Sequence, residues 1–322
     1  MHKRNRGVIL RTIEQHINFK DLELGLFAHP TQEPLLQINW QDMALGEFLR
    51  NYISTPRSVD FVSRSSIRED VAIAELSGLL LSHKDDTITV LDACCGAGTL
   101  ATRILKSMGD EVGRVRYFAI DEQPSSIKAI NSQLHDFDRF SSFKPIQRHV
   151  CDLHDLPRGS IDLIVLNNAL HEIPPRFFPA MFSVFNSLLN PSRGMVQIVD
   201  LESLPEDHPE SIAITWKAPE VEDFLAAAGL PAIVTRHPKV TMAFQAQVKH
   251  NLGGVHESQM LKSLQTSLNL KLSAAVISRR GIDANASSQF VQLEEWLVAT
   301  GTIARCAEEL DIIVNRTEPL IT

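Results

Sequence analysis

Through the middle of the chain, short apolar runs alternate with stretches in which apolar residues recur at helical spacing. The apolar runs occupy residues 88–91, 115–120, 145–151, 161–166 and 195–200, and helical patterns separate most of them. Runs of this kind fit strands buried on both faces of a parallel sheet. Two further runs, 232–236 and 240–248, predict an antiparallel pair at the sheet edge. The pattern therefore predicts an α/β domain with a seven-stranded, mostly parallel sheet and helices on both faces.

Helical patterns flank this region on both sides. Before it, apolar spacing predicts helices over residues 9–17, 43–53 and 65–81. After it, an apolar stripe begins at Met260, a loop is expected over 279–288, and further helix over 290–314. We therefore expect a helical N-terminal extension (1–86), a central domain (87–250) and a helical C-terminal extension (251–322). The last extension should pack either on its own domain or across a homodimer.

Composition narrows the class of partner. The chain has 322 residues and a net charge of -8, which disfavours a nucleic-acid surface because phosphate binding needs clustered Lys and Arg. Its four cysteines show no metal-ligand spacing, so no metal site is predicted and reduced thiols are the simplest interpretation. No apolar run is long enough to span a membrane, and the basic N-terminus lacks the apolar core of a secretory signal. We expect a cytoplasmic location.

The segment from Thr87 to Thr99 carries the strongest signal for a ligand. A strand-forming run ends at Asp92, a glycine-containing loop follows, and a helical pattern begins after it. Strand, glycine turn and helix form the entry to a nucleotide-binding unit, and Gly96 and Gly98 let the backbone pass close to a ligand. A carboxylate beside a pyrophosphate would be unfavourable. Asp92 therefore suits a ligand with a cationic end rather than a dinucleotide.

At this segment the chain resembles the class I S-adenosylmethionine-dependent methyltransferases, whose first motif reads acid-x-Gly-x-Gly-x-Gly. Here the motif runs from Asp92 to Gly98, and Cys94 replaces the first glycine. The resemblance covers roughly residues 85–250 and implies a Rossmann-like fold, S-adenosyl-L-methionine as cofactor and transferase activity. It also suggests that helices before the first strand cover the substrate pocket. Packing on the sheet is the other role open to them.

Three later positions match further cofactor contacts of the resembling family. Asp121 follows the second strand, where a carboxylate is the expected partner of the ribose hydroxyls. Glu122 takes that place if the strand runs one residue longer, and a helix N-cap is the alternative role. After the third strand, the resemblance implies that Asp152 and Leu153 contact the adenine ring. Asn167 would meet the methionine part of the cofactor.

The segment from Asn167 to Pro174 indicates which class of methyl acceptor to expect. It has neither the N/D-P-P-Y/F element of DNA amino-methyltransferases nor the Cys after a Pro of cytosine C5 enzymes. Its Leu-His-Glu-Ile-Pro form resembles the small-molecule branch of the family. His171 could remove a proton from an O–H or N–H acceptor, or could be structural. Glu172 is a candidate substrate contact, and many such enzymes need no base.

Three functions fit these observations. The first is methyl transfer to a small molecule, the second is methyl transfer to RNA or protein, and the third is a non-catalytic scaffold that kept the fold. The combined acid and glycine positions disfavour the scaffold, which needs none of them. The acidic balance and the His-Glu segment favour a small-molecule acceptor.

Overall fold

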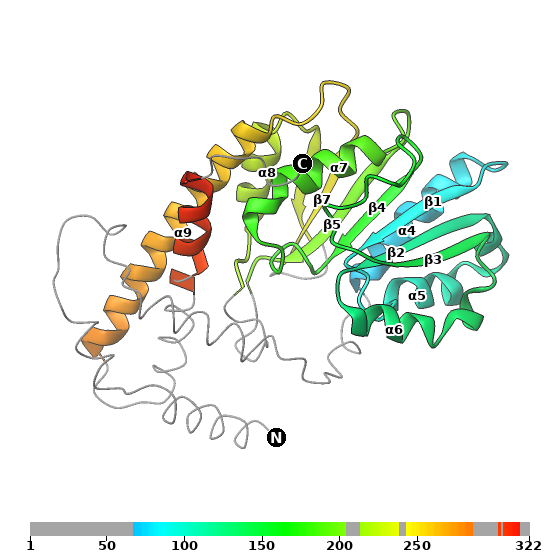
Figure 1. Ribbon diagram of the computed structural model, residues 1–322, viewed down its shortest axis with the longest axis horizontal. Helices are drawn as coiled ribbons and strands as arrows, with labels where there is room; N and C mark the ends of the chain where they lie inside the picture. Colours follow the sequence, from blue (N-terminus) through cyan, green and yellow to red (C-terminus); the bar gives the residue numbers. More distant parts are fainter. Residues whose placement is uncertain (1–66, 204–212, 238–242, 286–301, 304, 316–322) are drawn as a thin grey trace, which may run out of the picture.

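The computed structural model describes residues 67–203, 213–237, 243–285, 302–303 and 305–315, so the two helices predicted within 9–17 and 43–53 lie outside it. One seven-stranded sheet has the order β3-β2-β1-β4-β5-β7-β6 (Figure 1). The strands are β1 Ile88–Ala93, β2 Val115–Asp121, β3 Ser142–Gln147, β4 Leu163–Asn167, β5 Met195–Leu201, β6 Ala232–Arg236 and β7 Ala243–Lys249. β7 runs antiparallel to both of its neighbours, β5 and β6, and the other pairings are parallel, which confirms the predicted mostly parallel sheet with an antiparallel edge pair.

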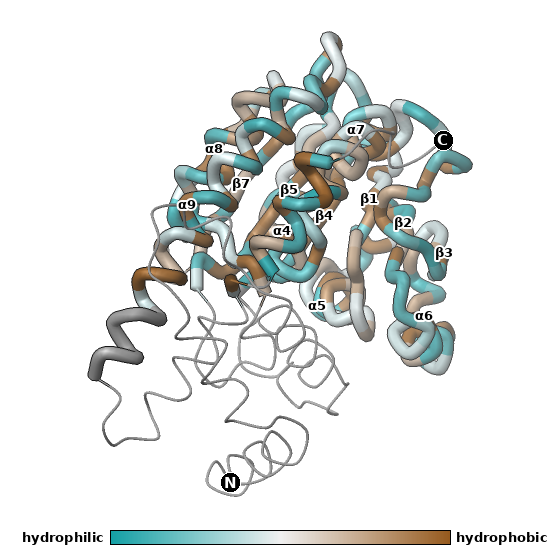
Figure 2. Tube along the Cα trace, turned by 60° about the vertical axis from the view of Figure 1, so that its left-hand side comes forward, coloured by the Kyte–Doolittle hydropathy of each residue, from teal (hydrophilic) through white to brown (hydrophobic). Residues whose placement is uncertain are grey.

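Helices cover both faces of the sheet. The α-helices are α4 Ile67–Ser82, α5 Thr99–Ser107, α6 Pro124–Asn131, α7 Phe178–Leu188, α8 Ala218–Ala227 and α9 Glu257–Asn285. The 3-10 helices are η3 Gly109–Arg114, η4 Leu134–Phe137 and η5 Pro175–Phe177. Successive strand residues point to opposite faces, so Val90 packs in a core with α4, α5 and α6, whereas Leu91 packs with α7, α8 and α9. Figure 2 shows the resulting hydrophobic segments along β1 and β4.

The third strand lies earlier than its apolar pattern predicted. We expected residues 145–151, and the structure places β3 at Ser142–Gln147. β3 is an edge strand that pairs only with β2, so it tolerates Pro145 and needs no continuous apolar run. The chain turns directly after it, because the Asp152 N–H donates to the His149 carbonyl at 2.9 Å. The apolar residues Val150 and Cys151 therefore belong to a turn and not to the strand.

The loop predicted at 279–288 is wrong in its described part, because α9 continues to Asn285. Arginine favours helix, and one internal glycine costs only about 1 kcal/mol, which a long helix anchored at its other end tolerates. Residues 302–303 and 305–314 are helical, as predicted. Ile303, Cys306 and Leu310 join the same apolar core as Leu264 of α9 and Phe182 of α7. The described part of the C-terminal extension thus packs on the central domain, where α9 lies against α7 and α8.

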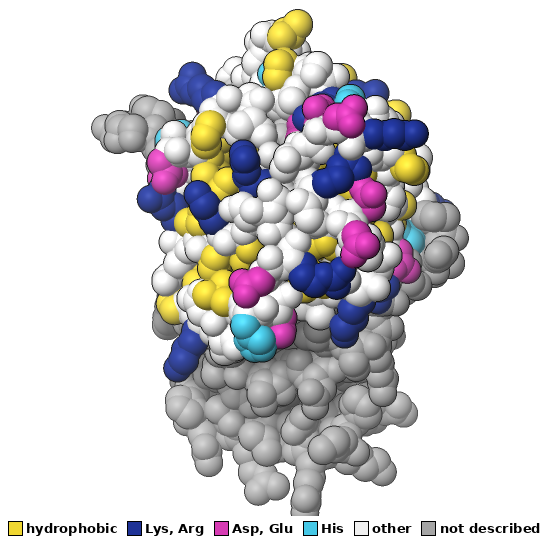
Figure 3. All heavy atoms as spheres, turned by 90° about the vertical axis from the view of Figure 1, so that its right-hand side faces the viewer, with side chains coloured by type: hydrophobic (Ala, Val, Ile, Leu, Met, Phe, Trp, Pro, Cys, Tyr) yellow, Lys and Arg dark blue, Asp and Glu magenta, His cyan; other side chains and the backbone are white. Residues whose placement is uncertain are grey.

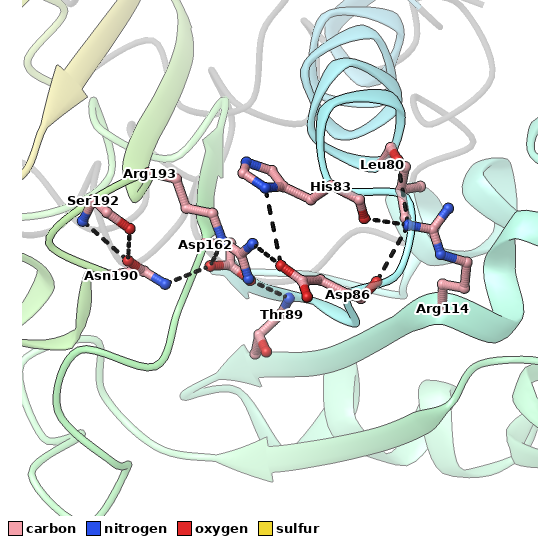
Figure 4. Close-up of polar contacts among 9 residues, drawn as sticks. All are labelled: Leu80, His83, Asp86, Thr89, Arg114, Asp162, Asn190, Ser192 and Arg193. Carbon is pink, nitrogen blue, oxygen red and sulfur yellow. Dashed lines mark hydrogen bonds and ion pairs between the residues drawn. The ribbon is translucent and has the colours of Figure 1, made fainter.

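The amino ends of the strands are fastened by a buried polar network (Figure 4). Asp162, only 2% exposed, accepts hydrogen bonds from the Thr89 N–H at 2.9 Å, from Arg193 Nε at 2.8 Å and from Asn190 Nδ2 at 3.1 Å. Arg193 also pairs with Asp86 at 2.5 Å and holds the pKa of that carboxyl below its usual value. The network ties the starts of β1, β4 and β5 together. Among the described helices, none has the length and apolar character needed to span a bilayer.

We expect Arg193→Ala to lower the free energy of unfolding by about 2–3 kcal/mol, because it leaves the buried Asp162 carboxylate without its guanidinium. Urea unfolding measures the change, and Lys106→Ala, which removes an exposed lysine, should stay within about 0.5 kcal/mol of the wild type. A loss of less than about 0.5 kcal/mol for Arg193→Ala would contradict this role for the network.

Candidate functional site

A cavity of about 430 Å³ opens at the carboxyl ends of the central parallel strands. Its wall comes from residues 94–97, 121–123, 148–150, 167–169 and 172–174, with Arg68 and Glu69 added by the first turn of α4. The strand order reverses between β1 and β4, which is where open α/β sheets bind ligands. The rest of α4 packs on the sheet through Leu76 and Leu80. This one helix therefore serves both roles considered for the N-terminal helices.

The glycine loop adopts backbone conformations that only some residues tolerate. Gly96 has φ +53° and lines the cavity, and a Cβ built on it would meet no atom within 4 Å, so that space is open to a ligand. Gly98 has φ +81°, but its Cβ would lie 3.2 Å from Ile130 Cγ1 and it does not line the cavity. The expectation that both glycines make room for a ligand thus fits Gly96, whereas Gly98 allows close packing of the loop on α6.

Cys94, which replaces the first glycine of the three-glycine motif, keeps a glycine-like backbone conformation. It adopts φ +60°, the left-handed conformation, at the position where the motif has its first glycine. Asn168, with φ +53°, is the other non-glycine residue of this kind among those described, and both line the cavity. Such backbone costs on the order of 1–3 kcal/mol per residue and concentrates at functional sites.

The four thiols are not activated. Burial raises the pKa of Cys151 and of Cys306 to about 12 each. Burial, with nearby carboxylates, also raises the pKa values of Cys94 and Cys95 well above the ordinary value. All four are free cysteines that stay protonated at neutral pH, so the site does not favour thiolate chemistry.

Asp92 is a buried acid at the carboxyl end of β1. Its carboxylate is 4% exposed, lines the cavity and accepts a hydrogen bond from the Tyr117 hydroxyl at 2.6 Å. The pKa of Asp92 is raised to about 7, mainly by burial; the Tyr117 hydrogen bond opposes the rise, and the neighbouring carboxylates Asp121 and Glu69 add to it. A positive charge in the cavity would compensate this carboxylate.

Asp121 and Glu122 both line the cavity at the end of β2. The strand runs one residue further than predicted and includes Asp121, which is the case in which Glu122 was the alternative ribose contact. Asp121 accepts hydrogen bonds from the Gly96 N–H at 2.9 Å and the Gln123 N–H at 2.8 Å, so it also fixes the glycine loop. Each carboxylate oxygen retains acceptor capacity for a ligand. Glu122 is exposed, with Oε2 3.9 Å from His149 Nε2.

The two residues predicted to meet an adenine ring lie away from the cavity wall. Asp152 is exposed and Leu153 is buried in the core, and neither lines the cavity. Arg148, His149 and Val150 line it instead. Our sequence reasoning missed these three because it placed the third strand too late. A strand ending at Gln147 would have identified them as the strand-tip residues.

Unpaired polar atoms mark the wall beside β4. Asn167, as predicted for a site residue, lies at the end of β4 and lines the cavity. Its Oδ1 and Nδ2, Asn168 Oδ1 and Glu69 Oε2 are buried and have no hydrogen-bond partner among the described residues. Each buried polar atom without a partner costs about 1–3 kcal/mol of folding free energy. A polar ligand that hydrogen-bonds to these atoms would remove this cost, which would favour its binding. These atoms fit a ligand that carries donors and acceptors.

His171 and Glu172 are brought together, but only Glu172 reaches the cavity wall. The His171 side chain is fully buried, with Nδ1 2.7 Å from Asp200 Oδ1 and Nε2 3.9 Å from Glu172 Oε1. The backbone N–H of His171 also donates a hydrogen bond to Asp200 Oδ2 at 3.1 Å. Asp200, at the end of β5, was not anticipated from the sequence, since an acid in a strand pattern carries no special signal.

The cavity wall is predominantly acidic. It has five carboxylates, Glu69, Asp92, Asp121, Glu122 and Glu172, against the basic side chains of Arg68, Arg148 and His149. Arg148 is already paired with Asp155 at 2.7 Å. Among the described residues, no group of three or more His, Cys, Asp or Glu side chains is arranged to hold a metal ion. The wall favours a cationic organic ligand.

We expect Asp92→Asn to stabilise the protein at pH 8 and to change little at pH 4. The folded-state pKa of Asp92, about 7, lies above its unfolded value, so ionising this buried carboxylate lowers wild-type stability as pH rises from about 4 to 7. The asparagine variant lacks that cost, which amounts to at most about 4 kcal/mol. Urea unfolding across this pH range measures it. A stability difference that does not depend on pH would contradict the raised pKa.

Part of this chain is similar to known methyltransferases. A family model described as a methyltransferase domain matches residues 90–192. A SAM dependent methyltransferase from Aquifex aeolicus has 19% identity and a TM-score of 0.43, covering 55% of this chain and 89% of that one. The plantazolicin methyltransferase BamL has 13% identity and a TM-score of 0.48, covering 66% of this chain and 97% of that one. No curated protein matches the sequence.

Proposed function

We propose that this chain is a class I S-adenosylmethionine-dependent methyltransferase that methylates a small-molecule acceptor in the cavity described above; the match of residues 90–192 to a methyltransferase domain supports the reaction class. The acidic cavity wall supports this acceptor class best, since five carboxylates attract a cationic cofactor and repel a phosphate backbone. On the face drawn in Figure 3, basic and acidic side chains are interspersed and form no single-sign patch. This surface also gives no support to a nucleic-acid acceptor.

The residues of the wall fit the cofactor's functional groups. Asp92 and Glu69 Oε2 would pair with the ammonium group of the cofactor. Asp121 or Glu122 would accept hydrogen bonds from its ribose hydroxyls. Asn167 would pair with the methionine end, and the loop from Cys94 to Gly98 would leave room along Gly96. For adenine, His149 and Val150 of the wall take the place of Asp152 and Leu153, the contacts predicted from the sequence, which lie away from the wall. The cofactor supplies a methyl group already activated on a sulfonium.

The protein's part in the reaction is to align the acceptor, exclude water and take up a proton where the acceptor carries one. Glu172 lies at the cavity wall and would receive that proton. His171, buried between Glu172 and Asp200, would hold Glu172 in place and share the charge. An acceptor that carries no proton would need only the alignment.

We expect Asp92→Asn to weaken binding of S-adenosylmethionine and S-adenosylhomocysteine at least tenfold, because both ligands carry the ammonium that Asp92 opposes. Calorimetric titration measures both affinities. The matched control is Asp86→Asn, a carboxylate at the opposite ends of the strands, which should leave them unchanged. Wild-type protein should also release a proton on binding at pH 6, since the ligand cation lowers the pKa of Asp92 from about 7.

Equal affinity of wild type and Asp92→Asn would show that the cofactor contacts are wrongly assigned. Failure of the folded wild type to bind either ligand would contradict the proposed function as a whole.

We expect His171→Ala and Glu172→Gln to reduce turnover at least tenfold while S-adenosylhomocysteine affinity changes less than threefold, because proton uptake occurs only during transfer. Turnover is measured with an acceptor found by screening small molecules against labelled cofactor. Full activity of His171→Ala would assign that side chain a structural role. Methylation of RNA or protein, with none of any small molecule, would favour the alternative acceptor class.

A further inference from the structure

The C-terminal helical segment carries a charge that packing does not explain. Ile303, Cys306, Leu310 and Ile313 are buried in the apolar core, and Figure 1 shows this segment (red) beside α9. Glu309 lies among them and has no exposed surface. Burying a carboxylate is costly, and replacing a whole buried ion pair with well-packed apolar residues is often neutral or stabilising. A role beyond stability is therefore the better explanation for Glu309.

Glu309 contacts Arg176 at two points. Its Oε1 pairs with Arg176 Nη1 at 2.5 Å, and its Oε2 accepts the Arg176 backbone N–H at 3.3 Å. That N–H lies in the first turn of η5, where a helix leaves its donors unsatisfied. Burial raises the pKa of Glu309, while the Arg176 charge opposes the rise. The double contact fixes both the side chain and the backbone of Arg176.

Arg176 connects directly to the cavity wall through the backbone. Glu172, Ile173 and Pro174 line the cavity, and Arg176 follows Pro174 by two residues. At its other end this segment is fixed to the sheet, because the His171 N–H donates to Asp200. The wall from Glu172 to Pro174 is thus held between Asp200 of β5 and Glu309 of the C-terminal segment.

A second path runs through ring contacts. The Arg176 guanidinium lies 4.9 Å from the centre of the Phe177 ring. The Phe177 ring meets the His149 ring edge-on, with centres 5.0 Å apart and planes at 63°. His149 lines the cavity, and its Nδ1 accepts the Cys151 N–H at 3.2 Å. A shift of Arg176 would therefore disturb two separate parts of the wall.

We infer that Glu309 is a positioning residue of the methyltransferase site: through Arg176 it sets the cavity wall formed by His149 and residues 172–174. This inference rests on the proposed function, since it assumes that the cofactor or its acceptor occupies this cavity. It assigns the C-terminal segment a part in binding, in addition to its contribution to the core. No interaction of Glu309 with the ligand itself is involved.

The test compares Glu309→Gln with Leu310→Ala. In the glutamine variant one oxygen becomes an NH₂ group, which must face either the guanidinium or the backbone N–H. The control removes apolar packing from the adjacent residue of the same helix and leaves the Arg176 contacts intact. We expect Glu309→Gln to weaken S-adenosylhomocysteine binding roughly 3- to 30-fold by titration calorimetry, and Leu310→Ala less than twofold.

Hydrogen exchange distinguishes a positioning role of Glu309 from a general contribution to stability. Glu309→Gln should speed exchange in residues 172–177 and leave α9 unchanged, whereas Leu310→Ala should speed exchange in α9. If Glu309→Gln does not fold, Arg176→Gln tests the same contact from a side chain that is 22% exposed. The same loss of affinity is expected there.

The inference would be overturned if the wild type binds S-adenosylhomocysteine and the folded Glu309→Gln or Arg176→Gln variant binds it with the same affinity. Equal losses in Glu309→Gln and Leu310→Ala would do the same, because they would reduce Glu309 to packing. Failure of the wild type to bind would instead contradict the proposed function, so the two failures are distinguishable.

Discussion

Burial of both faces of the parallel sheet is the constraint on which the rest of the structure depends. Val90 and Leu91, adjacent in β1, enter two different cores, so both faces of this central strand are packed with apolar side chains. The charged groups of the central strands lie at the two strand ends. The amino ends carry the Asp162–Arg193 network, and the carboxyl ends carry the cavity. Structural and functional charges are thereby separated by the length of the strands.

The pKa shifts of the carboxyl groups have opposite directions at the two ends of the strands. At the amino ends, Arg193 lowers the pKa of Asp86, so the charged form is favoured and the strands are held together. At the carboxyl ends, burial raises the pKa of Asp92 to about 7, and Glu69 and Asp121 add to the rise. An acid held in this way destabilises the fold above neutral pH. Sites that bind charged ligands commonly show this trade between stability and function.

Backbone strain is concentrated at the same end. Cys94 and Asn168 both have positive φ and both line the cavity, one after β1 and one after β4. The surrounding hydrogen bonds hold them there: the Cys95 N–H donates to the Ile120 carbonyl at 2.9 Å, and the Asn168 N–H to the Val199 carbonyl at 2.7 Å. Each loop is therefore fixed by the neighbouring strand. The C-terminal segment adds a comparable constraint through Glu309 and Arg176.

The sequence by itself predicted the sheet, the resemblance to methyltransferases and the acids at two strand tips. Strand periodicity and the Asp92-to-Gly98 motif are local, because alternating burial and a glycine turn are written in neighbouring residues. The tertiary structure alone decided that Arg148 and His149 line the cavity and that Asp200 holds His171. It also decided that Glu309 meets Arg176. These contacts join residues far apart in the chain, and their identity depends on where each strand ends and which faces are buried, which no local pattern specifies.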